Sequence, residues 1–225
     1  MLRAIIFDFN GVIVDDEPIQ FRMFQKVLEE EGISLLEQEY RARFIGVSDE
    51  KCFTDVLAEH NKDVSERKIK DLISRKSAYY LAYSKKNVNV LPGVLDFIKS
   101  AASNYPLAIC SGALRNEIES ILEAAGIRRE FQVIVSTEDV ATSKPDPEGF
   151  LLALLLINKS FAGEPIGSHQ CLVVEDSLPG IEAAHRAGMK CAAITSTYSA
   201  AELASADIVK DSLASLDLEE IKRLF

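Results

Sequence analysis

Short apolar runs recur along the chain and alternate with stretches of helical periodicity. Five of these runs, rich in Val and Ile, cover residues 4–7, 107–110, 133–135, 171–174 and 191–194, and a weaker sixth covers residues 208–209. Polar, Gly or Pro residues bound the runs, which is typical of strands buried on both faces. Helical patterns cover residues 95–102, 115–125, 147–157 and 179–187. This alternation predicts an α/β fold, a Rossmann-like parallel sheet with helices on both faces.

One long segment interrupts the alternation after the first apolar run. Residues 16–90 contain helical patterns at 17–31, 36–44, 49–60 and 65–83 and no convincing strand. Pro92 and Gly93 then give a turn signal, after which strands and helices alternate again. We therefore expect a core made of residues 1–15 and 91–225, with a bundle of four helices inserted at residues 16–90.

Composition and charge limit the classes of partner. The 225 residues carry a formal net charge of −10, which argues against nucleic acids and anionic membranes as partners. A small anionic substrate would need a metal ion or a local group of Lys and Arg to offset this field. The first ten residues include Arg3 and Asp8 and no long apolar stretch, so we expect no signal peptide.

The cysteines and the longest apolar run bear on location. Four cysteines are scattered without any CxxC pattern, and we interpret Cys110 and Cys171 as buried apolar residues in a reducing compartment. The longest apolar run, residues 150–157, is too short to span a bilayer. We expect a cytoplasmic protein without a membrane partner, and a monomer as the default oligomeric state.

Polar residues follow four of the expected strands at the edge where such sheets bind ligands. An aspartate at a single strand end is often only a helix N-cap, but four polar strand ends in one chain are much more specific. In chain order these residues are Asp8, Asn10, Ser111, Gly112, Thr137, Lys144, Glu175, Asp176 and Ser177.

Their order resembles the motifs of the haloacid dehalogenase-like hydrolase superfamily, and in particular its capped phosphatases and β-phosphoglucomutases. The similarity covers essentially the whole chain, so it implies that residues 16–90 form a cap domain on a catalytic core. The four motifs correspond to Asp8, Asn10 and Gly11, then Ser111, then Lys144, and then Glu175 with Asp176.

The resemblance also implies a mechanism. Asp8 would attack phosphorus and form an aspartyl phosphate. Mg²⁺ would bind the Asp8 and Asp176 carboxylates and the Asn10 backbone carbonyl, with Glu175 orienting a metal-bound water. The phosphoryl oxygens would be held by Ser111, the Gly112 amide and Lys144.

Three further residues are candidates for substrate binding. Gly46 begins the segment GVSDEK, which resembles a substrate-specificity loop of the mutase-like members. Lys76 matches a lysine of their cap. Arg115 follows the second strand and could bind an anionic group, although a surface charge at the start of a helix is an equal alternative.

Asn10 stands where the resembled enzymes have a second aspartate that protonates the leaving oxygen and then activates water. An amide exchanges no proton, so loss of this group lowers turnover by roughly 10² to 10⁴ while binding survives. Asn10 could be an engineered trap, a natural variant or the mark of a binder that lost catalysis. We favour a natural variant, because Gln20 and Asp49 also replace a His and an Arg of the mutase-like relatives.

We therefore expect a Mg²⁺-dependent phosphatase, a phosphoric monoester hydrolase that acts on small phosphorylated metabolites and is slowed by Asn10. A β-phosphoglucomutase-like phosphotransferase is an alternative, weakened by Asn10 and by Asp49, which would repel a second phosphate. A non-catalytic protein that binds phosphorylated metabolites is the other alternative.

Overall fold

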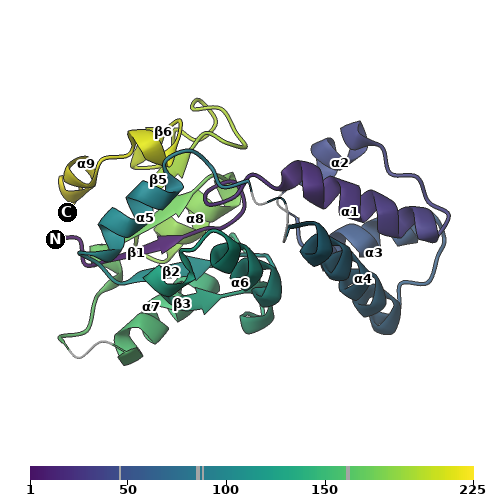
Figure 1. The fold of residues 1–225 in the computed structure, drawn as a ribbon, viewed down its shortest axis with the longest axis horizontal. Helices are drawn as coiled ribbons and strands as arrows, with labels where there is room; N and C mark the ends of the chain where they lie inside the picture. Colours follow the sequence, from purple (N-terminus) through teal and green to yellow (C-terminus); the bar gives the residue numbers. More distant parts are fainter. Residues whose placement is uncertain (46, 85–86, 88, 161–162) are drawn as a thin grey trace. The chain divides into compact units, whose positions relative to one another are not determined.

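The computed structural model describes residues 1–45, 47–84, 87, 89–160 and 163–225. The chain forms two compact units, which we call the sheet unit (Met1–Asp15 and Val88–Phe225) and the helical unit (Asp16–Asn87). Figure 1 shows the strands in the first unit and α1 to α4 in the second.

A six-stranded sheet in the order β3-β2-β1-β4-β5-β6 forms the centre of the sheet unit, and all its pairings are parallel. This confirms the predicted α/β sheet and places β1 between β2 and β4. The strands are β1 (Ala4–Phe7), β2 (Leu107–Cys110), β3 (Phe131–Val135), β4 (Cys171–Glu175), β5 (Lys190–Ile194) and β6 (Ile208–Lys210). The α-helices of the sheet unit are α5 (Val94–Ala102), α6 (Arg115–Ala124), α7 (Glu148–Ser160), α8 (Leu178–Arg186) and α9 (Leu218–Lys222).

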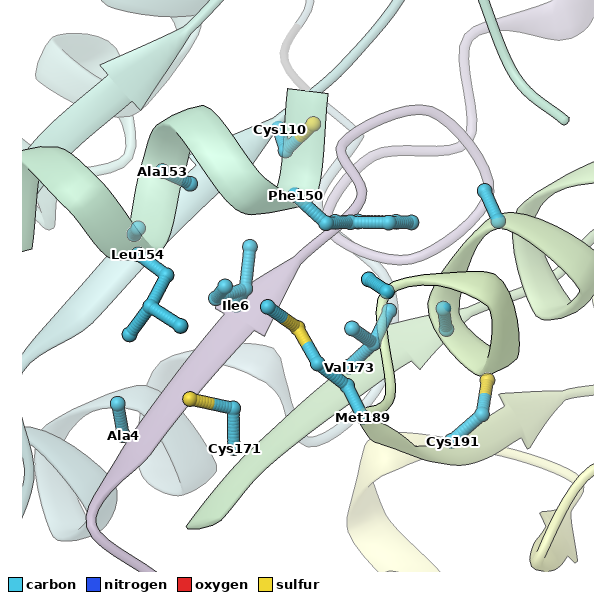
Figure 2. Close-up of a cluster of buried hydrophobic side chains, with 14 of the residues drawn as sticks. Ala4, Ile6, Cys110, Phe150, Ala153, Leu154, Cys171, Val173, Met189 and Cys191 are labelled. Atoms are coloured by element: carbon cyan, nitrogen blue, oxygen red, sulfur yellow. The ribbon is translucent and has the colours of Figure 1, made fainter. Parts of the chain in front are cut away.

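Both faces of the central strand are buried, which explains its uninterrupted apolar sequence. Ala4 and Ile6 belong to a core that includes Phe150 and Leu154 of α7, and Figure 2 shows these side chains together. On the other face, the Phe7 ring lies 6.1 Å from that of Phe97 in α5, measured between centroids. Because burial of each large apolar side chain contributes about 1.5–3 kcal/mol, this two-sided packing fixes β1 firmly.

The third strand begins earlier than the apolar pattern predicts. Phe131 already pairs with Leu107, and the register shifts between Leu107 and Ala108. At this shift, the Leu107 amide donates to the side-chain oxygen of Gln132, at 2.6 Å. Gln132 therefore occupies an irregularity of the sheet, and its polar side chain hid the first two residues of β3 from the sequence pattern.

The helical unit contains α1 (Glu17–Glu30), α2 (Glu37–Arg43), α3 (Asp49–Glu59) and α4 (Glu66–Ser84), close to the four predicted patterns. α4 packs against both α1 and α3. Their apolar faces form a separate core that includes Phe24, Phe53 and Leu72. This unit thus buries its own apolar surface, as a compact bundle requires.

All four cysteines are free and buried. Across the described ranges, no helix combines the length and the apolar character needed to cross a lipid bilayer.

Candidate active site

The Asp8 carboxylate lies directly beyond β1. The Asp8 amide donates to the Val174 carbonyl at 2.8 Å, which continues the pairing with β4 by one residue. Only 8% of Asp8 is exposed, and its Oδ1 accepts a hydrogen bond from Lys144 Nζ at 2.5 Å. The central strand therefore delivers a buried carboxylate to an ammonium group.

Lys144 connects the ends of three strands. Besides Asp8, its Nζ donates to Glu175 Oε1 at 2.6 Å and to the Cys110 carbonyl at 3.1 Å. Burial alone would lower the pKa of Lys144, but the charges of Asp8 and Glu175 outweigh this effect and raise it well above its ordinary value. Lys144 is therefore a firmly charged cation at the ends of β1, β2 and β4.

Glu175 is completely buried, and its second oxygen is also engaged. Oε2 accepts from the Asp176 amide at 2.9 Å and from the Ser177 amide and hydroxyl at 3.0 and 2.8 Å. A Cβ at Gly180 would lie 1.9 Å from this carboxyl group, so only glycine leaves room for it. Glu175 is thus held rigidly from both sides.

Asp176 meets the turn that follows β1. Its Oδ2 accepts a hydrogen bond from the Thr197 hydroxyl. Gly11 has a φ of +74°, and a Cβ there would lie 2.0 Å from the same oxygen. The Ser196 hydroxyl donates in turn to the Gly11 carbonyl. The glycine turn is therefore shaped around the Asp176 carboxylate.

Negative charge exceeds positive charge among these buried groups. Burial is the main cause that raises the pKa of Asp8 to about 7, with Lys144 opposing the shift and Glu175 adding to it. Burial, followed by the charges of Glu175 and Asp8, also raises the pKa of Asp176 well above its ordinary value. Lys144 pairs with Asp8 and Glu175 but has no such contact with Asp176, so a further cation would stabilise the ionised forms of these carboxyl groups.

Ser111 and Gly112 line the end of β2. The Ser111 hydroxyl donates to Asn10 Oδ1 at a long 3.4 Å and accepts from the Ala113 amide at 3.1 Å. A Cβ at Gly112 would meet nothing within 4 Å, so there is open space beside this residue. The structure therefore brings Asn10 and Ser111 together and leaves room next to Gly112.

Comparison with known proteins agrees with this arrangement. The family model described as haloacid dehalogenase-like hydrolase matches residues 5–194, most of the chain. The chain belongs to the haloacid dehalogenase-like hydrolases. The hydrolase is 31% identical over 221 residues to the chloroplastic 5-amino-6-(5-phospho-D-ribitylamino)uracil phosphatase of Arabidopsis thaliana, a match that covers 97% of this chain and 57% of that protein.

Other relatives match over more of their own length. The phosphorylated carbohydrates phosphatase of Thermotoga maritima is 31% identical over 84% of this chain and 83% of its own. The crystal structure of CbbY from Rhodobacter sphaeroides with phosphate has a TM-score of 0.87 at 26% identity, over 99% of this chain and 100% of that one. By contrast, the hydrolase spans only 20% of the chloroplastic protein SUPPRESSOR OF QUENCHING 1 of Arabidopsis thaliana, at 27% identity over 98% of this chain.

Arg115 of the hydrolase has acidic and carbonyl partners of its own. Its guanidinium donates to Asp139 at 2.6 Å and to the Ile134 carbonyl at 2.9 Å. Asp139 also accepts from the Ser136 amide and hydroxyl, both at 2.7 Å. Arg115 thus ties the start of α6 to the end of β3, which gives it a structural role.

Two candidate residues belong to the helical unit. Lys76 is buried, with its Nζ 2.6 Å from Asp49 Oδ1 and 4.3 Å from the centroid of the Phe24 ring. In the same unit, the Gln20 amide donates to Asp16 at 2.8 Å. The Lys76 charge is therefore balanced within its own unit. Gly46 lies outside the described residues.

Ser196 and Thr197 are residues of this site that the sequence reasoning missed. They follow β5 directly and contact the Gly11 carbonyl and the Asp176 carboxylate. The same rule that selected polar residues after the first four strands applies to the fifth, so the signal was present in the sequence.

A separate surface cavity of about 250 Å³ contains none of these residues. Two basic side chains that line this cavity contact the Asp207 carboxylate: Lys190 Nζ lies at 2.7 Å and His185 Nε2 at 3.2 Å. Its lining residues are His169, His185, Gly188, Met189, Lys190 and Asp207.

We predict that Gly11→Ala destabilises the hydrolase more than Gly126→Ala. Both glycines have positive φ, +74° and +72°, so both variants bear the strain of about 1–2 kcal/mol. Only the Gly11 variant meets a side chain, whereas a Cβ at Gly126 meets nothing within 4 Å. Overpacking should cost the Gly11 variant a further 1–3 kcal/mol, roughly, in urea unfolding. Equal losses would contradict the close approach of Gly11 to Asp176.

Proposed function

We propose that the hydrolase is a Mg²⁺-dependent phosphatase of small phosphorylated metabolites that acts through an aspartyl phosphate on Asp8. The observation that carries this proposal is the buried Asp8 carboxylate, paired at 2.5 Å with Lys144 at the end of the central strand. Relatives named as phosphatases, including one of phosphorylated carbohydrates, support the reaction class. The helical unit would serve as the cap domain.

Each step follows from the chemistry of the side chains. An Asp8 oxygen forms a bond to phosphorus as the bond to the leaving oxygen breaks, and water later cleaves the acyl phosphate to restore Asp8 and release phosphate. Lys144 would offset the charge of the phosphoryl group, and Ser111 with the Gly112 amide would bind its oxygens. The Asn10 amide supplies no proton to the leaving oxygen and takes none from water, so both steps slow down.

The buried carboxylates at the strand ends are oxygen ligands of the kind that Mg²⁺ binds. Asp8, Glu175 and Asp176 are buried, and Lys144 pairs with the first two. When all three carboxyl groups are ionised they carry two more negative charges than Lys144 offsets, and a divalent cation would balance this excess. Within the described ranges no group of three or more His, Cys, Asp or Glu side chains is arranged as a metal site. Two carboxylates and the Asn10 backbone carbonyl would instead hold the ion, which usually keeps several waters. The bound ion would shield the repulsion between Asp8 and an anionic phosphate.

A phosphometabolite-binding protein is the second candidate, and Asn10 is the observation that favours it. An Asp-to-Asn variant of CbbY from Rhodobacter sphaeroides was crystallised with xylulose-1,5-bisphosphate, so that relative binds a sugar bisphosphate despite the substitution. Its crystal structure has a TM-score of 0.85 at 27% identity, over 96% of each chain. The mutase-like alternative is less favoured, because Asp49 neutralises Lys76 in the helical unit.

Mass spectrometry of the intact protein tests the proposed function. We expect one added phosphoryl group after mixing with Mg²⁺ and acetyl phosphate or p-nitrophenyl phosphate, whose leaving groups need little protonation. The adduct should be absent from Asp8→Ala and present in Asp15→Ala, which removes an exposed carboxylate from the same loop. If the protein binds phosphate but never gains the added mass, it is a binding protein and the proposed phosphatase function is wrong.

We also predict that Mg²⁺ raises the melting temperature and that Asp176→Ala abolishes this increase. At a Mg²⁺ concentration of about 100 Kd the ion contributes about 2.7 kcal/mol, roughly 5–10 °C for a chain of this size. The measurement is the Mg²⁺-induced shift at constant ionic strength, because removing a buried carboxylate changes the metal-free baseline as well. An undiminished shift in Asp176→Ala would place the ion elsewhere.

A further inference from the structure

The loop after β5 contacts both partners of the Gly11 turn. The Ser196 hydroxyl donates to the Gly11 carbonyl, and the Thr197 hydroxyl donates to Asp176 Oδ2. A Cβ at Gly11 would lie 3.2 Å from the Thr197 hydroxyl and 2.0 Å from Asp176 Oδ2. The Gly11 turn and the loop after β5 thus converge on one oxygen of the Asp176 carboxylate.

This loop is held at both ends. The Thr195 amide donates to the Lys210 carbonyl of β6 at 2.9 Å. Glu202 accepts from the Ser199 amide at 2.9 Å and from the Ser199 hydroxyl at 2.6 Å. Between them, Tyr198 packs against the apolar core on one face of the sheet. The Thr197 hydroxyl is therefore presented by a fixed backbone.

We propose that Thr197 is a positioning residue that orients the Asp176 carboxylate for Mg²⁺, an inference that rests on the metal site of the proposed function. The Thr197 hydroxyl donates a hydrogen bond to Asp176 Oδ2. In the described part of the chain no hydrogen-bond donor contacts Oδ1 of the same carboxylate. The carboxylate thus presents one oxygen to an ion and is fixed by the other. Groups that orient a metal ligand in this way typically contribute 10- to 100-fold, roughly, to metal affinity.

Calorimetric titration with Mg²⁺ alone tests the inference without reference to turnover. Thr197→Val keeps the shape and removes the hydroxyl, and we expect its Kd for Mg²⁺ to rise about 10-fold or more. Thr197→Ser restores the hydroxyl and should bind within about threefold of the unmodified hydrolase. The readout is the Kd for Mg²⁺ and not the metal-free melting temperature, because Thr197→Val also removes the donor to an oxygen of the buried Asp176. Ser199→Ala is the matched control, because it removes a hydroxyl of the same loop that contacts Glu202.

The outcomes separate the inference from the proposed function. If the unmodified hydrolase binds Mg²⁺, Asp176→Ala does not, and Thr197→Val binds as tightly as the unmodified protein, then Thr197 has no positioning role and the metal site stands. If Thr197→Val and Ser199→Ala weaken binding equally, the effect belongs to the loop as a whole and the inference is wrong. If Asp176→Ala binds Mg²⁺ as well as the unmodified hydrolase, the metal site and the inference both fall.

Discussion

Asn10→Asp should raise the turnover of phosphomonoesters by roughly 10² to 10⁴ with Mg²⁺ present. The new carboxylic acid can protonate the leaving oxygen and, once ionised, can activate the water that cleaves the aspartyl phosphate. Its position suits this role, because residue 10 is two residues from Asp8 and its side chain reaches Ser111 at 3.4 Å. The gain should be largest for substrates with poor leaving groups such as sugar alcohols.

Two measurements make this prediction decisive. In the unmodified hydrolase the phosphorylated species should accumulate during turnover of a reactive donor, whereas in Asn10→Asp it should disappear faster than it forms. Asn104→Asp places the same charge change at an exposed position, and it should leave the rates at which the phosphorylated species forms and disappears unchanged. Unaltered turnover in Asn10→Asp would show that another group already performs the proton transfers.

Lys144→Met should lower the free energy of unfolding by about 3–5 kcal/mol in the absence of metal. The variant removes the ammonium shared by Asp8 and Glu175 and leaves both carboxyl groups buried without it. Lys190→Met is the control, because its ion pair with Asp207 involves a side chain that is 44% exposed and contributes about 0–1 kcal/mol. Urea unfolding of both variants gives the comparison.

The pH dependence of this loss has a definite sign. The pKa of Asp8 is raised from 3.8 to about 7 chiefly by burial, so the folded state binds more protons than the unfolded state between these values. Metal-free stability should therefore fall as the pH rises from about 4 to about 7. Without Lys144 the fall should be steeper, and the deficit of Lys144→Met should shrink at low pH. A deficit that is constant with pH would indicate lost packing and no lost charge compensation.

The sequence predicted the elements whose signals are local. Uninterrupted apolar runs identified the strands, and the rule of polar strand ends identified Asp8, Lys144 and Asp176 as neighbours at one edge of the sheet. Gln132 interrupted such a run and hid the start of β3, because a sheet irregularity depends on a partner strand. The catalytic and metal-binding roles given to the site residues stay predictions.

Pairings between distant segments could not be predicted in the same way. Arg115 and Lys76 were selected as candidates for substrate binding, and the structure places Asp139 beside the first and Asp49 beside the second. A charge pattern does not say which acidic residue a folded chain brings near a basic one. Thr197 is a different case, because applying the strand-end rule to the fifth strand would have found it.

The order of the strands in the sheet has a consequence for synthesis on the ribosome. Ala4 pairs with Cys171, so β1 is made long before one of its two neighbours exists. At about 5–20 residues per second, the intervening chain takes roughly 10–30 s to emerge. During that interval the apolar segment from Ala4 to Phe7 lacks one of its two neighbouring strands. Asp8 also lacks its ion-pair partner Lys144 until late in the interval. A nascent chain stalled before β4 should therefore bind chaperones and be cut readily by proteases, and release of the full chain should end both susceptibilities together.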